Sequence, residues 1–81
     1  MSKKISVADV KIIDTVEQRA EIASFFNQCV DKAESLLQRG VPSGYSHYAN
    51  VAYLLDFLFV TGIVDRKSFD NVKSGIDGVF K

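Results

Sequence analysis

Apolar and polar positions alternate with the period of an α-helix along most of this chain. Between residues 15 and 39, apolar side chains recur every three or four positions, with charged and polar side chains opposite them. Asp14 or Thr15 can cap the start of this stretch, and Gly40 suits the position after its end. The apolar side comprises Ile22, Phe26, Cys29, Val30, Ala33, Leu36 and Leu37. We predict a long amphipathic helix over residues 15–39.

A second amphipathic stretch follows Gly62, which would end one helix, and Asp65, which would cap the next. Its apolar side comprises Phe69, Val72, Ile76, Val79 and Phe80. Gly75 and Gly78 lower the helix propensity of its last turns. We predict a helix over residues 66–80 whose last turns are weak.

The stretch between these helices is apolar on nearly every side. After the break at residues 40–44, Ser46 can cap a helix that continues to Thr61. Its core side comprises Val51, Leu54, Leu55 and Leu58, with Tyr53 and Phe57 on one flank and Tyr48, Ala52 and Phe59 on the other. The two neighbouring helices have narrow apolar stripes, which cannot cover all of these sides in so short a chain. We predict a helix over residues 46–61 with a surface that something else covers.

Residues 1–13 fit neither the helical nor the strand period, because their apolar members are β-branched and unevenly spaced. The run from Ser6 to Asp9 matches a capping-box pattern, so this segment is a short helix or an extended arm. We expect residues 1–81 to form one compact all-α domain of three helices, or of four if this segment is helical. The long first helix would pack on a hairpin of the other two, and the domain would be a homodimer.

Composition narrows the range of functions. The chain is 47% hydrophobic and 25% charged, as globular domains are, and ten Lys and Arg balance ten Asp and Glu. No net field therefore draws the molecule to nucleic acid or to an anionic membrane. The longest apolar stretch, residues 51–60, is too short to span a membrane, and residues 1–13 lack the apolar core of a signal peptide. Since Cys29 has no second cysteine to pair with, we expect a cytoplasmic protein without membrane contacts.

The residue types of a hydrolase occur in Ser46, His47 and Asp56, but their spacing does not bring them together. Neighbouring side chains on a helix diverge by about 100°, so Ser46 is poorly placed to receive His47 as its base. The chain has one His and one Cys, without the spacing of a metal site or a glycine-rich phosphate loop. We expect no enzyme activity, no cofactor and no small-molecule substrate.

Aromatic side chains around residues 46–61 are the candidates for binding, because tyrosine supplies contact area and one polar group. The candidate contacts in a homodimer or with a protein partner are Tyr45, Tyr48, Tyr53, Asp56, Phe57 and Phe59. The tyrosines can equally pack at the edge of the domain's own core. Asp56 lies either on a solvent-exposed edge of the helix or in a polar contact between subunits. We expect a small non-enzymatic interaction protein of the adaptor, regulator or inhibitor type, acting through an apolar and aromatic helical surface.

The alternative is a DNA-binding transcriptional regulator, in which residues 46–61 and 66–80 form a helix-turn-helix. The candidate DNA contacts are Arg66, Lys67, Asn71 and Lys73. Residues 65–81 carry four basic and three acidic residues, whereas tight phosphate binding needs clustered positive charge. We therefore rank this alternative below the protein-binding function.

The run from Gly62 to Asp65, followed by Phe69, Asp70 and Lys73, resembles the order of residues in SHOCT-like bacterial hairpins. The resemblance covers residues 62–73. It implies a helical hairpin at this position and no particular function.

Overall fold

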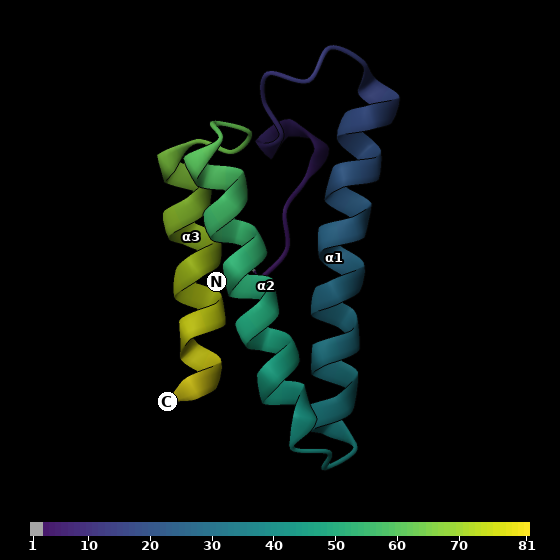
Figure 1. Cartoon of the computed structure of the whole chain (residues 1–81), viewed down its shortest axis with the longest axis vertical. Coiled ribbons are helices and arrows are strands. Elements are labelled where there is room, and N and C mark those ends of the chain that lie inside the picture. The colour runs from purple at the N-terminus through teal and green to yellow at the C-terminus, as the bar shows by residue number, and fades with distance from the viewer. Residues whose placement is uncertain (1–2) are drawn as a thin grey trace.

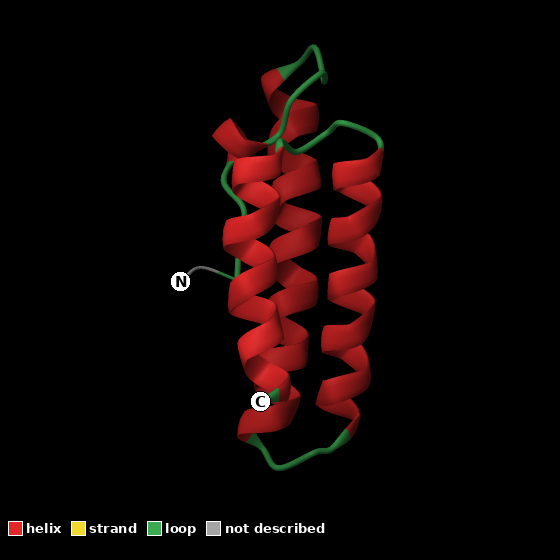
Figure 2. Ribbon diagram, turned by 90° about the vertical axis from the view of Figure 1, so that its left-hand side faces the viewer, coloured by secondary structure: helices red, strands yellow, loops and turns green. Residues whose placement is uncertain are grey.

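Three α-helices form the domain in the computed structural model, which describes residues 3–81. They are α1 (Val16–Gln38), α2 (Ser43–Val60) and α3 (Arg66–Asp77), accompanied by the 3₁₀ turns η1 (Val7–Asp9) and η2 (Gly78–Phe80). α2 contacts both α1 and α3 and runs antiparallel to both; it lies between them in the view of Figure 1 and to one side of them in that of Figure 2. The prediction of a compact all-α domain of three helices is confirmed, while residues 1 and 2 of the predicted N-terminal segment lie outside the described residues. No described helix is long and apolar enough to cross a membrane.

The ends of α1 follow the sequence pattern. The side chain of Thr15 accepts a hydrogen bond from the backbone N–H of Gln18 at 3.2 Å, so Thr15 rather than Asp14 caps the helix. Gly40 follows the last turn with φ +77°, a left-handed conformation that glycine adopts without strain. The N–H of the next residue, Val41, donates to the carbonyl of Leu36 at 2.8 Å and closes the helix end.

The turn between α2 and α3 also forms as the sequence predicts. Gly62 has φ +80° and ends α2, and the carboxylate of Asp65 accepts a hydrogen bond from the N–H of Ser68 at 2.8 Å. The α-helical part of the predicted helix 66–80 ends at Asp77. Gly78–Phe80 continues as a 3₁₀ turn, since glycine weakens an α-helix.

The start of α2 differs from the prediction, because the helix begins at Ser43 and Ser46 lies inside it. Pro42 precedes the helix with φ −61°, a value that proline favours and the first turn accepts. Gly44 is buried against α1, where an added Cβ would lie 2.6 Å from Cγ of Leu37. Pro42 and Gly44 therefore start a helix and let it approach α1, whereas their residue types predict a break between helices.

The N-terminal segment forms an arm with one 3₁₀ turn, so the described residues contain no fourth α-helix. The arm lies along the seam between α1 and α3, as the purple trace in Figure 1 and the side view in Figure 2 show. Asp9 in η1 accepts a hydrogen bond from the hydroxyl of Ser68 at the start of α3, at 2.8 Å. Ile5 and Val10 of the arm are buried in the core.

The core lies where the three helices and the arm meet. Its buried members are Ile5, Val10, Ala23, Phe26, Val30, Ala33, Tyr48, Val51, Leu55, Leu58, Val64, Val72 and Ile76. Phe59 of α2 stacks on Phe69 of α3, with ring centroids 4.4 Å apart. One flank of α2 is therefore covered within the domain, while Tyr53 and Phe57 on the other flank are exposed.

Candidate protein-binding groove

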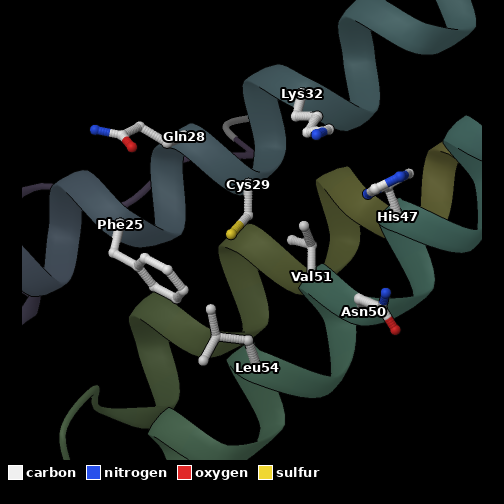
Figure 3. A pocket seen from close by; sticks show the side chains of 8 residues that line it. All are labelled: Phe25, Gln28, Cys29, Lys32, His47, Asn50, Val51 and Leu54. Atoms are coloured by element: carbon white, nitrogen blue, oxygen red, sulfur yellow. The ribbon is translucent and has the colours of Figure 1, made fainter.

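A groove with an apolar floor runs between α1 and α2. A hollow of about 540 Å³ is lined by Phe25 and Cys29 of α1 and by Val51 and Leu54 of α2. Figure 3 shows Phe25 and Leu54 pointing toward each other across this hollow, with the sulfur of Cys29 directed between the helices. The polar residues around it are Gln28, Lys32, His47 and Asn50. We call this hollow, together with its extension toward the turn that joins α2 to α3, the α1–α2 groove.

The groove extends toward the turn that joins α2 to α3. A second hollow of about 390 Å³ shares Phe25 and Leu54 with the first, so the two adjoin at these side chains. Its further lining includes Ile22, Phe57 and Glu21. The groove therefore follows both helices over several turns, with apolar side chains along its length and polar groups around it.

Large apolar side chains are exposed on α1 and α2, and two of them, Phe25 and Phe57, line this groove. The exposed fractions are 60% for Phe25, 57% for Phe57, 79% for Tyr53 and 81% for Val60. Single exposed apolar residues are common, whereas a group of them at a groove is typical of interaction sites.

Phe25 is absent from the predicted contacts, although the sequence carries a signal for it. Phe25 and Phe26 are adjacent, so a helix cannot turn both of them toward the same core. Phe25 shares a helix side with Ile22 and Cys29, which are three residues before it and four after it. This second apolar stripe on α1 faces the groove.

The six predicted contacts separate into covered and exposed residues. Tyr48 is only 1% exposed, and this burial is the main factor that raises the pKa of its phenol. Phe59 is half-buried against α3, and the ring of Tyr45 lies 6.1 Å from that of Phe80. Tyr48 and Phe59 thus pack within the domain, as the alternative interpretation allowed for the tyrosine, whereas Tyr45 is 49% exposed despite its contact with Phe80. Tyr53 and Phe57 remain available on the surface.

Asp56 has a partner inside the chain. Its carboxylate lies 3.4 Å from the ammonium group of Lys73 on α3, and both side chains are partly exposed. An ion pair of this kind contributes about 0.2–1 kcal/mol. The charge of Asp56 therefore has a partner on α3.

The candidate DNA contacts on α3 do not form a basic surface. Lys73 is paired with Asp56, and Arg66 lies 3.7 Å from Asp70. Lys67 and Asn71 are exposed. A helix-turn-helix crosses its second helix over the first at about 90–120°, whereas α3 runs back alongside α2 (Figures 1 and 2).

The candidate hydrolase residues lie on different sides of α2. Ser46 is exposed, His47 lines the α1–α2 groove, and Asp56 lies on the flank that faces α3. Within residues 3–81, no three His, Cys, Asp or Glu side chains are grouped as they would be to hold a metal ion. The chemistry that the groove offers is apolar contact with polar groups at its margins.

The fold and the groove together define a small all-α domain with an open, elongated apolar surface. Comparisons of the chain with models of protein families, with curated proteins and with solved structures find no match. The function of the chain is therefore inferred from the chemistry of the groove.

Proposed function

We propose that this protein is a non-enzymatic interaction module that binds helical protein surfaces in the α1–α2 groove. The observation that carries the proposal is the exposure of Phe25 and Phe57, which line the groove and are each exposed by more than half. An amphipathic helix that enters such a groove buries apolar residues spaced three and four apart. Burying a large apolar side chain fully contributes about 1.5–3 kcal/mol, so a few of these residues can provide most of the binding free energy.

A module of this kind acts as an adaptor, regulator or inhibitor, because it changes which proteins are held together. Binding without catalysis agrees with the separation of Ser46, His47 and Asp56 on α2. We place the protein in the cytoplasm, where a lone half-buried thiol such as that of Cys29 stays reduced. The homodimer expected from the sequence would use the same groove.

A photo-reactive phenylalanine analogue, introduced into the full chain at Phe57, tests the proposal directly. Irradiation in living cells is expected to join the chain covalently to a bound protein, because Phe57 lines the groove and is 57% exposed. The matched control position is Val16, which is 64% exposed at the start of α1 and does not line the groove. Equal cross-linking from both positions, or none from position 57, would contradict the proposed function.

A further inference from the structure

We infer that the occupant of the α1–α2 groove is a second copy of this chain, packed antiparallel so that Glu21 of one copy lies against Lys32 of the other. The inference rests on the proposed function, because it assigns a partner to the same groove. A two-fold axis would place one groove on the other, and α1 and α2 of both copies would form a four-helix bundle. The surface of α2 that its own domain leaves open would then be covered.

The charges near the two ends of the groove point to this partner. Glu21 lines the hollow that contains Phe57, and Lys32 lines the hollow that contains His47. In Figure 3, Lys32 and His47 extend toward each other from α1 and α2 at one end of the first hollow. Neither Glu21 nor Lys32 forms an ion pair within residues 3–81. The groove therefore has an acidic end and a basic end whose charges are not neutralised within the domain.

The spacing of these charges fits an antiparallel pair. Glu21 and Lys32 are eleven residues apart on α1, which is about three turns and about 16 Å, so they lie on the same side of the helix. A two-fold axis midway between them brings each Glu21 opposite Lys32 of the other copy, twice in one dimer. A parallel pair would instead oppose like charges, which costs several kcal/mol.

The same axis also brings apolar groups together. Phe25 lies close to the midpoint between Glu21 and Lys32 along α1. Its ring would therefore meet the apolar floor of the other copy, formed by Cys29 and Leu54. Aromatic groups at the centre of an interface, with charged pairs toward its margins, are the usual arrangement of a specific contact.

The size of the surface is sufficient for a stable dimer. The molecule measures 40 Å along its longest axis and 22 and 19 Å along the other two. A lengthwise side of it therefore offers on the order of 800 Å², which is what each partner contributes to an interface of standard size.

Charge reversal tests the antiparallel pairing. The native chain is expected to sediment as a dimer at micromolar concentration. Glu21→Lys and Lys32→Glu should each raise the Kd of that dimer at least about tenfold, since every such homodimer opposes like charges at both pairs. An equimolar mixture of the two variants should restore the dimer, because Lys at position 21 of one chain then meets Glu at position 32 of the other.

Recovery of the dimer in the mixture also shows that both variants fold. The matched control is Lys67→Glu on the exposed side of α3, which should sediment as the native chain does. A monomeric native chain, reversals without effect, or a mixture that stays monomeric would each overturn the inference. The cross-linking experiment tests the proposed function separately from this inference. If the chain is monomeric and position 57 cross-links only to other proteins, the proposed function stands and the second copy is contradicted. If position 57 forms no cross-links, the proposed function itself is contradicted.

Discussion

The side chain of Asn27 on α1 binds the backbone of Ile5 in the arm through two hydrogen bonds. The N–H of Ile5 donates to Oδ1 of Asn27 at 2.9 Å, and Nδ2 of Asn27 donates to the carbonyl of Ile5 at 2.8 Å. A single amide side chain thus satisfies both backbone groups of one residue, much as a neighbouring strand would. This contact holds the Ile5 side chain in the core, where it is 3% exposed.

Asn27→Ala is expected to destabilise the protein by about 1–3 kcal/mol, because two partly buried backbone groups lose their partners. Urea unfolding would measure the loss, and amide hydrogen exchange should accelerate at Ile5. Asn71→Ala removes an exposed amide from α3 and should change stability by less than about 0.5 kcal/mol. Unchanged exchange at Ile5 would show that other contacts hold the arm.

The conformation of the arm could not be predicted because its partners lie far along the chain. Ile5 binds a residue 22 positions away, and Asp9 binds Ser68, which is 59 positions away. The local pattern from Ser6 to Asp9 does form a turn, in which the N–H of Ser6 donates to the carboxylate of Asp9 at 2.8 Å. The local contact was thus visible in the sequence, while the long-range contacts that position the arm were not.

Gly44→Ala is expected to destabilise the protein by about 1–3 kcal/mol, through overpacking between α2 and α1. The new methyl group would lie 2.6 Å from Cγ of Leu37 and 3.0 Å from the carbonyl oxygen of Ala33. Gly78→Ala is the matched control, since Gly78 has helical φ −60° and nothing within 4 Å of an added Cβ. That control should stabilise the protein by about 0.4–1 kcal/mol. Thermal unfolding of both variants distinguishes them, and similar melting temperatures would contradict the prediction.

The limits of the three helices show which signals act locally. Thr15 and Asp65 cap helices through their own side chains, and Gly40 and Gly62 end helices through their own backbone, so these limits were predictable. The start of α2 was not predictable, because the role of Gly44 depends on its contact with α1, which forms only in the folded protein.

The candidate site was predicted only on α2. Tyr53 and Phe57 were identified from the apolar excess of that helix, and both are exposed. The covering of Tyr48 and Phe59 depends on how the neighbouring helices pack, and the pairing of Asp56 depends on where Lys73 lies on α3. The sequence shows that Phe25 cannot face the same core as Phe26, but the groove that Phe25 lines with α2 emerges only when α1 is placed beside α2.

Acid is expected to weaken the attachment of η1 to α3 through Asp9. Burial raises the pKa of this carboxyl group, but hydrogen bonds from Ser6 and Ser68 outweigh it, so the pKa lies below its ordinary value of 3.8. A carboxyl group with a lower pKa in the folded state adds stability above that ordinary value. The added stability declines as the pH falls through 3.8 and is lost below the folded-state pKa.

The comparison of native protein with Asp9→Asn isolates this effect. Asp9→Asn should be less stable than the native protein at neutral pH, and the difference should shrink as the pH falls below 3.8. Ser68→Ala, which removes one hydrogen bond to the carboxylate, should reduce the pH-dependent difference without abolishing it. Urea unfolding at a series of pH values measures each difference, and a constant difference across the series would contradict the assignment.

Phe25 and Phe26 are adjacent in the chain but have opposite roles, and alanine substitution should separate these roles. Phe26 is fully buried, so Phe26→Ala should cost about 3–5 kcal/mol of stability, which is much of the total for a small domain. Phe25 is 60% exposed, so Phe25→Ala should change the free energy of unfolding by less than about 1 kcal/mol when the chain is dilute and monomeric. The same Phe25→Ala variant should weaken the dimer measured by sedimentation, because an aromatic group near the centre of an interface contributes strongly to binding.

Val16→Ala is the control, because it removes another exposed apolar side chain from α1, away from the groove, and should leave the dimer intact. If Phe25→Ala lowers stability as much as Phe26→Ala does, the ring packs within the domain and the groove between α1 and α2 is closed in the free protein.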